Sequence, residues 1–188
     1  MLASVLIAGA AVEGGAVGAG GVGTATRPGS TSTGHAKARQ GDTTWAVARL
    51  ERLAERVDRL TTAVEDDCAA HATGQVREFF RQHPCEALFR ALFEIREGDT
   101  VVRVAIAAVD MPDADLARQY QDVIDGEGTG TVRPLRRTGR GDDTGFDGTA
   151  YESARDDSTV VIAQAEPVGR APRAVELAER AVNAATSG

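Results

Sequence analysis

Aromatic side chains and lysine are both scarce in this sequence of 188 residues. Phe, Trp and Tyr together make up 4% of the chain, and Lys37 is the single lysine beside twenty arginines. With so few aromatic rings, the core must be built mainly from Val, Leu, Ile and Ala, which bury less area per residue. We therefore expect a modest hydrophobic core, in which a covalent cross-link contributes a large share of the stability.

Positive charge is also in deficit. The formal net charge is −7 and the isoelectric point is near 5.0, so no uniform basic field exists to attract nucleic acid. We expect no nucleic-acid partner. The length suits one globular domain with appendages.

Basic residues are absent from the apolar N-terminus. Residues 2–25 contain one charged residue, Glu13, and many alanines and glycines. As a helix this segment would be about 36 Å long, enough to cross a hydrocarbon core of roughly 30 Å, while residues 2–12 alone match the apolar part of a signal peptide. We assign residues 1–26 to export or membrane anchoring, with a disordered Ala/Gly tail as the alternative. Residues 27–43 are polar and predict a flexible linker.

A heptad-like pattern follows the linker. The apolar residues recur at spacings of four and three, which predicts an amphipathic helix beginning at residue 44. They are Ala46, Leu50, Leu53, Val57, Leu60 and Val64. We expect a helical stem and hairpin over residues 44–83. Its apolar stripe either packs on the chain's own domain or, through Leu50, Leu53, Val57 and Leu60, mediates self-association of the 44–66 helix.

Residues 84–188 predict a compact domain of the α+β class. Strands are expected at 88–96, 101–109, 148–155 and 158–165, with a short candidate at 131–135, and helices at 113–125 and 171–185. Short turns between consecutive strands require antiparallel pairing. The predicted fold is an antiparallel sheet of four to five strands with helices on one face, preceded by the long amphipathic helix and the helical hairpin.

Both cysteines and two of the three histidines fall within residues 68–85. If the chain reverses at Thr73 and Gly74, Cys68 and Cys85 can form a disulfide that closes a helical hairpin. The alternatives are a zinc site made of Cys68, His71, His83 and Cys85, two free structural thiols, or a nucleophilic Cys85. The ligand spacing matches no usual zinc-finger pattern, and exported proteins oxidise their thiols, so we favour the disulfide.

Two short motifs have simpler explanations than function. Residues 126–130 (GEGTG) follow a predicted helix, whereas a dinucleotide-binding loop follows a strand, so they indicate a helix end. Residues 140–142 spell the adhesion tripeptide RGD, which a chain rich in Arg, Gly and Asp contains by chance. We find no catalytic carboxylate pair and expect no cofactor.

Four runs in residues 74–167 resemble a family of uncharacterised membrane-anchored or secreted proteins from high-GC actinobacteria. They are HPCEALFRALFEIREGD, VAIAAVDMPDA, GEGTG and STVVIAQAEP. The resemblance implies an anchoring segment, a variable helical stem and an extracytoplasmic α+β domain, and it implies no activity. Unlike that family, this chain lacks basic residues before its apolar segment.

The sequence therefore predicts a non-catalytic domain of the cell envelope, anchored through residues 2–25 or secreted, which interacts with another protein. One alternative is a metal-binding protein or enzyme that uses the Cys/His cluster. The other is a regulatory protein that dimerises.

Overall fold

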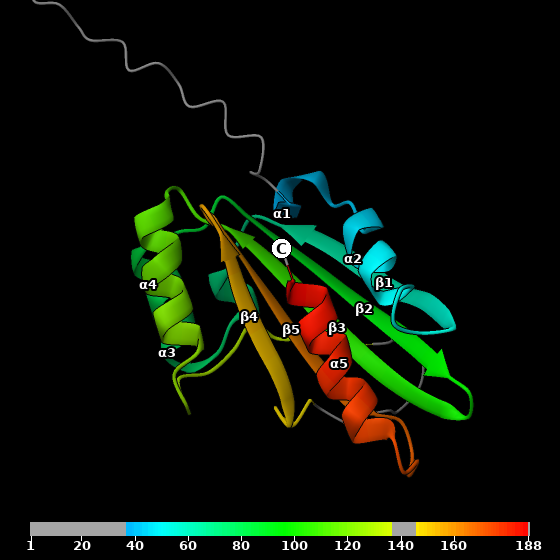
Figure 1. Ribbon diagram of the computed structural model, residues 1–188. Helices are drawn as coiled ribbons and strands as arrows, with labels where there is room; N and C mark the ends of the chain where they lie inside the picture. The colour runs from blue at the N-terminus through cyan, green and yellow to red at the C-terminus, as the bar shows by residue number, and fades with distance from the viewer. Residues whose placement is uncertain (1–36, 137–145, 188) are drawn as a thin grey trace, which may run out of the picture. The chain divides into compact units, whose positions relative to one another are not determined.

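Five antiparallel strands form one sheet in the order β1-β2-β3-β5-β4, so β1 and β4 are its two edges (Figure 1). The strands are β1 (Arg56–Glu65), β2 (Ala87–Glu97), β3 (Thr100–Asp110), β4 (Ala150–Asp156) and β5 (Thr159–Pro167). The computed structural model describes residues 37–136 and 146–187, which belong to one compact unit, Ser32–Gly188. The predicted segment 1–26 and most of the predicted linker lie outside the described residues.

Two hairpins make up most of the sheet, as the sequence predicted. Strands β2 and β3 pair from Glu97↔Thr100 onward around Gly98, and β4 and β5 pair from Asp156↔Thr159 onward. Gly98 and Asp157 have positive φ angles of 57° and 52°, which tight hairpin turns require. The candidate strand at 131–135 does not form, although Val132 makes an isolated bridge with Ala72.

Helices cover both faces of the sheet, so the prediction of helices on one face is wrong. The helices are α1 (Lys37–Gln40), α2 (Thr44–Leu50), η1 (Ala69–His71, a 3-10 turn), α3 (Gly74–Gln82), α4 (Ala114–Ile124) and α5 (Ala174–Thr186). The face covered by α2 and α5 buries Phe89, Phe93 and Ile106. On the opposite face, Leu88, Val109 and Val160 pack with side chains from α3 and α4. Strands β2 and β3 carry apolar side chains on both faces of the sheet. Helices must therefore pack on both faces to shield these side chains from water.

Residues 56–65 form an edge strand, which corrects the predicted helix over 44–66. Helix α2 ends at Leu50, and β1 pairs with β2 from Arg56↔Arg96 to Glu65↔Leu88. The register shifts between Arg59 and Thr61, which marks a β-bulge. Across this bulge, Val57 and Val64 lie on the same face even though they are seven positions apart. Heptad spacing and a bulged strand therefore give the same apolar pattern here.

The predicted stem is part of the domain. Strand β1 belongs to the sheet, and Val76 and Phe80 of α3 are buried in the core. Of the predicted helical hairpin, the turn η1 and helix α3 form, but the long first arm does not. The short helix α1 lies within the predicted linker, and its Ala38 is fully buried.

Helix α1 is hydrogen-bonded to the end of the central strand β3. The backbone N–H of Arg39 donates to Oδ2 of Asp110 at 3.1 Å, and the Thr159 hydroxyl donates to Oδ1 of the same carboxylate at 2.7 Å. Asp110 ends the central strand β3 and is 3% exposed, so a buried carboxylate is satisfied from two directions. Within the part of the chain that the structure describes, every helix is too short or too polar to cross a bilayer.

Candidate functional site

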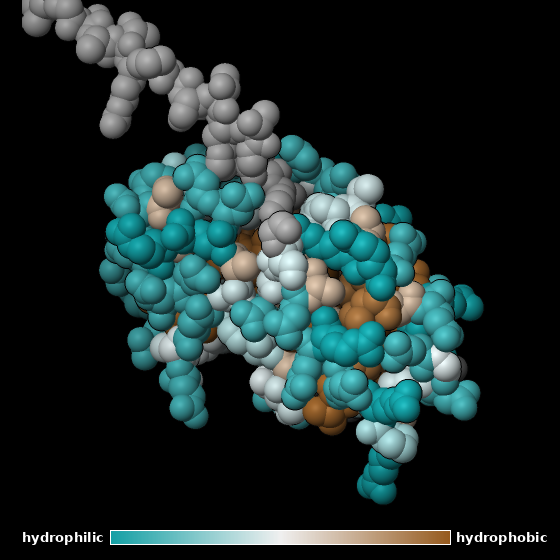
Figure 2. All heavy atoms as spheres, in the orientation of Figure 1, coloured by the Kyte–Doolittle hydropathy of each residue, from teal (hydrophilic) through white to brown (hydrophobic). Residues whose placement is uncertain are grey.

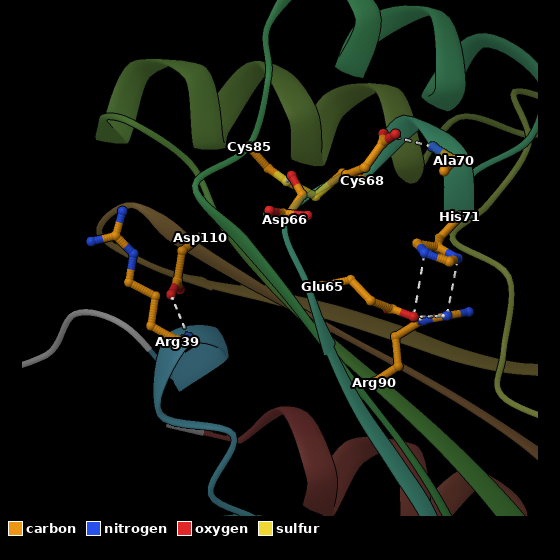
Figure 3. The surroundings of a disulfide bond; sticks show 10 residues. Arg39, Glu65, Asp66, Cys68, Ala70, His71, Cys85, Arg90 and Asp110 are labelled. Atoms are coloured by element: carbon orange, nitrogen blue, oxygen red, sulfur yellow. Dashed lines mark hydrogen bonds and ion pairs between the residues drawn. A yellow bond between two sulfur atoms is a disulfide. The ribbon is translucent and has the colours of Figure 1, made fainter.

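A disulfide joins Cys68 to Cys85, as the sequence predicted (Figure 3). The two Cα atoms are 6.1 Å apart, within the usual range for this bond. Cys68 immediately precedes η1 and is buried, while Cys85 lies in the connection between α3 and β2 and is partly exposed. The bond thus ties the end of β1 to the beginning of β2.

The reversal between the two cysteines depends on close contact with residues 126–131. Helix α3 begins at Gly74, whose φ is +56°, and the backbone N–H groups of Gln75 and Val76 both donate to the Thr129 carbonyl. Thr73 pairs with Thr131 through backbone and hydroxyl groups. The glycine-rich run therefore ends α4 and docks on the start of α3, which occupies the N–H groups that would otherwise bind an anion.

Three charged or ionisable side chains meet beside the disulfide (Figure 3). Arg90 of β2 contacts Glu65 of β1 through Nε and Nη2, at 2.9 and 2.5 Å, and its Nη1 donates to the Arg133 carbonyl at 2.8 Å. The Nδ1 atom of His71 lies 3.1 Å from Nη2 of Arg90, and its Nε2 lies 3.3 Å from Glu65. Arginine can only donate, so Nδ1 accepts and Nε2 carries the proton. Both ring nitrogens of His71 are therefore engaged.

The alternative zinc set is not assembled. Cys68 and Cys85 are bonded to each other, His71 is held by Arg90 and Glu65, and the His83 ring packs on Phe79 with centroids 4.9 Å apart. Among the described residues, no group of three or more Cys, His, Asp or Glu side chains has a geometry that could hold a metal ion. His35 lies outside the described residues.

A hollow of about 700 Å³ opens beside the disulfide, and we call it the disulfide hollow. Its charged lining consists of Arg77, Arg81, Arg133, Asp66 and Asp67, with Cys85 and Pro84 in its wall. Arg77 and Arg81 are exposed one turn apart on α3, while Arg133 is held by the carbonyls of Ala70 and Ala72 at 3.3 and 3.1 Å. The lining of the hollow thus carries charges of both signs.

The face covered by α2 and α5 has fewer features of a binding site than the disulfide hollow. In Figure 2 it is mostly hydrophilic, and its hydrophobic side chains occur in small separate patches. Arg49 of α2 donates to the Ala185 carbonyl at 3.0 Å and caps the end of α5. We infer that this face serves the packing of the two helices.

The predicted self-association stripe is dispersed. Leu50 is fully buried, and Leu53 and Val57 are partly buried against the core. Leu60 lies at the bulge of β1. These four residues do not form one exposed helical surface.

Sequence reasoning missed the contact between Arg90 and Glu65. The signal was available, because Arg90 interrupts the otherwise apolar run of residues 87–93, and a charge in a buried strand requires a partner. Its partner and the role of His71 depend on the pairing of β1 with β2, which the helix prediction concealed.

Comparisons with known proteins supply no function. No family model matches the sequence, and no curated protein and no solved structure matches it either. The function must therefore be argued from the residues themselves.

Proposed function

We propose that this chain is a cell-envelope protein whose described domain binds another protein outside the cytoplasm and catalyses no reaction. The observation that carries the proposal is the disulfide between Cys68 and Cys85. Such bonds persist in oxidising compartments and are rare in the reducing cytoplasm. The apolar residues 2–25 supply the export or anchoring segment that this location requires.

The binding surface in this proposal is the disulfide hollow. It combines exposed arginines on α3 with Asp66 and Asp67, and the disulfide joins the segment that carries these two aspartates to the segment that follows α3. A partner segment that carries both an acidic and a basic side chain would find a counter-charge for each. Because the walls are already positioned, binding costs little ordering of the domain.

The arrangement gives little support to catalysis. A nucleophilic cysteine must be a thiolate beside a free base, but Cys85 is bonded to Cys68 and both nitrogens of His71 are engaged. The metal-binding alternative needs the same two cysteines as thiolates. We therefore place interaction ahead of both alternatives.

The first experiment tests the compartment. The protein is isolated from the cell envelope with thiols blocked at lysis, then denatured without reductant and titrated with a thiol reagent. We expect no reactive thiol, and two after reduction. Two reactive thiols before reduction would sink the proposal.

The second experiment tests the hollow. A photo-cross-linking amino acid replaces Arg81 in the hollow or, as the matched control, Arg180 on α5, which is exposed on a different element. We expect an adduct of one defined mass from position 81 in intact cells and none from position 180. Equal labelling from both positions, or no adduct at position 81, contradicts binding at the hollow.

A further inference from the structure

Strand β1 is one of the two edge strands of the sheet. Among the described residues, β2 is the one strand that pairs with β1, so the other row of its backbone N–H and C=O groups faces outward. In the other edge strand, β4, the hydroxyls of Tyr151 and Ser153 both donate to Asp125, the residue that follows α4. Val64 of β1 is 52% exposed, which is unusual for a large apolar side chain in this domain.

The two ends of β1 are complementary to each other. Read RVDRLTTAVE from both ends: Arg56 corresponds to Glu65, Val57 to Val64, and Arg59 to Thr62. Two copies of β1 aligned antiparallel about a twofold axis between Leu60 and Thr61 would place these residues opposite each other. Each end would then match an arginine with a glutamate and a valine with a valine.

The β-bulge makes this alignment geometrically possible. In a regular strand, residues an odd number apart face opposite sides, so Val57 and Val64 could not meet across a twofold axis. Because the register shifts between Arg59 and Thr61, both valines lie on the face of Phe89 and Ile95. Arg56 and Glu65 both lie on the other face, opposite Arg96 and Leu88.

We propose that β1 pairs antiparallel with β1 of a second copy of this chain, in the register that sets Val57 against Val64 and Arg56 against Glu65. The two five-stranded sheets then continue into one. Shifting the partner by two residues in one direction sets Asp58 against Glu65, and in the other it sets Arg56 against Ala63. The first shift brings two carboxylates together, and the second leaves Arg56 opposite an alanine, so the charges of β1 favour the unshifted register, although Glu65 is also held by Arg90 of its own chain.

Charges and bulges on edge strands usually discourage pairing with other strands. Here the same features are complementary when the partner is identical. Arg56 is exposed and already lies 2.8 Å from Asp58. It therefore helps to set the register of the two strands but adds little to the affinity of the dimer. This inference goes beyond the proposed function, since it depends neither on the compartment nor on the disulfide hollow.

The register can be tested by disulfide trapping in the full chain, kept in a non-ionic detergent. Copies with Arg59→Cys are mixed with differently tagged copies with Thr62→Cys and oxidised with copper-phenanthroline. Both positions are exposed and lie opposite each other in the proposed pair. The control mixes Arg59→Cys with Val64→Cys, which lies two residues farther along on the same face. Because a disulfide needs Cβ atoms about 4 Å apart, we expect about fivefold more mixed dimer from the first mixture.

Affinity is tested by sedimentation of the unmodified chain beside two matched variants. Val64→Lys introduces a charge at the proposed interface, and Val175→Lys makes the same change at a valine that is 50% exposed on α5. We expect the dissociation constant of the dimer to rise about tenfold in the first variant and to stay unchanged in the second. A wild-type monomer at every concentration, equal losses in both variants, or trapping without preference for the first mixture would each overturn the proposal.

Discussion

Arg90 of β2 and Glu65 of β1 form a two-point ion pair, with Nε and Nη2 of the guanidinium at 2.9 and 2.5 Å from the two carboxylate oxygens. The Arg90 side chain is 8% exposed and that of Glu65 is 21% exposed. A guanidinium in this position is expensive to bury alone, and the contact with Glu65 offsets that cost.

Replacing one partner should therefore destabilise the domain strongly. We expect Arg90→Met to lower the free energy of unfolding by about 3 kcal/mol, because Glu65, His71 and the Arg133 carbonyl all lose a donor. Denaturant unfolding measures the change. A cycle with Glu65→Gln and the double variant should give a coupling energy of about 1–3 kcal/mol.

The control for that measurement is an exposed ion pair. Arg118 and Asp115 on α4 are 2.9 Å apart and are both exposed. Arg118→Ala should change the stability by less than about 0.5 kcal/mol. If Arg90→Met were equally mild, the buried pair would contribute nothing beyond a surface contact.

Loss of the disulfide should also cost stability. In the variant with Cys68→Ser and Cys85→Ser, we expect the free energy of unfolding to fall by about 3 kcal/mol, because the unfolded chain regains the entropy of an open loop. Thermal and denaturant unfolding report the change. Reducing the wild-type protein should lower its free energy of unfolding by a similar amount. A variant as stable as the oxidised protein would show that the disulfide does not stabilise the domain.

Two glycines hold the contact between α3 and residues 126–131. A Cβ on Gly74 would fall 2.4 Å from the Thr129 carbonyl oxygen, and one on Gly130 would fall 2.3 Å from that of Thr73. Both glycines also have positive φ angles. We expect Gly74→Ala or Gly130→Ala to cost well over the roughly 1 kcal/mol of the backbone conformation alone, measured by urea unfolding.

Gly98 allows the cost of a positive φ angle to be measured without a steric clash. Its φ is +57°, but no atom other than those of Gly98 and its two chain neighbours lies within 4 Å of the site where a Cβ would stand. Gly98→Ala should therefore cost only about 1 kcal/mol. Equal losses at positions 74 and 98 would mean that the backbone near Thr129 can move aside.

Alkaline pH should unfold the domain. Burial, the largest cause, raises the pKa of Tyr120 and of Tyr151 above the ordinary value, and the hydrogen bond to Asp125 raises that of Tyr151 further. Since the folded state holds these protons more tightly than the unfolded chain, their stabilising contribution is complete below about pH 10 and is lost as the pH rises above it.

Absorbance can follow this directly, because Tyr120 and Tyr151 are the two tyrosines of the chain. We expect tyrosinate absorbance in the native protein to appear only together with loss of circular dichroism, whereas protein in guanidinium should titrate near pH 10. A native protein that ionises at pH 10 and stays folded would contradict the burial argument. Tyr120→Phe should be neutral or stabilising, since within the described residues its buried hydroxyl has no hydrogen-bond partner.

Much of this fold is predictable because its signals are local. The hairpins follow from β-branched runs on either side of Gly98 and Asp157, and α4 begins where the Asp113 side chain accepts the N–H of Leu116. Cys68 and Cys85 could be paired because the chain between them can turn at Gly74.

The rest required contacts that the sequence does not display. Strand β1 has an apolar spacing that suits a helix as well, and its pairing with β2, distant along the chain, decides between them. The partner of Arg90 could not be found while residue 65 was assigned to a helix. The covers on both faces could have been expected, because Ala105, Ala107 and Val109 leave no polar side on that part of β3.

The disulfide also affects how fast the edge strand β1 can join the sheet during folding. In the reduced chain, β1 and β2 must find each other across η1 and the whole of α3. Once Cys68 and Cys85 are joined, only Asp66, Asp67 and Glu86 lie beside the bonded pair between the two strands. The pairing of β1 with β2 then has the contact order of a hairpin, so the search for the edge strand becomes a local and fast step of folding.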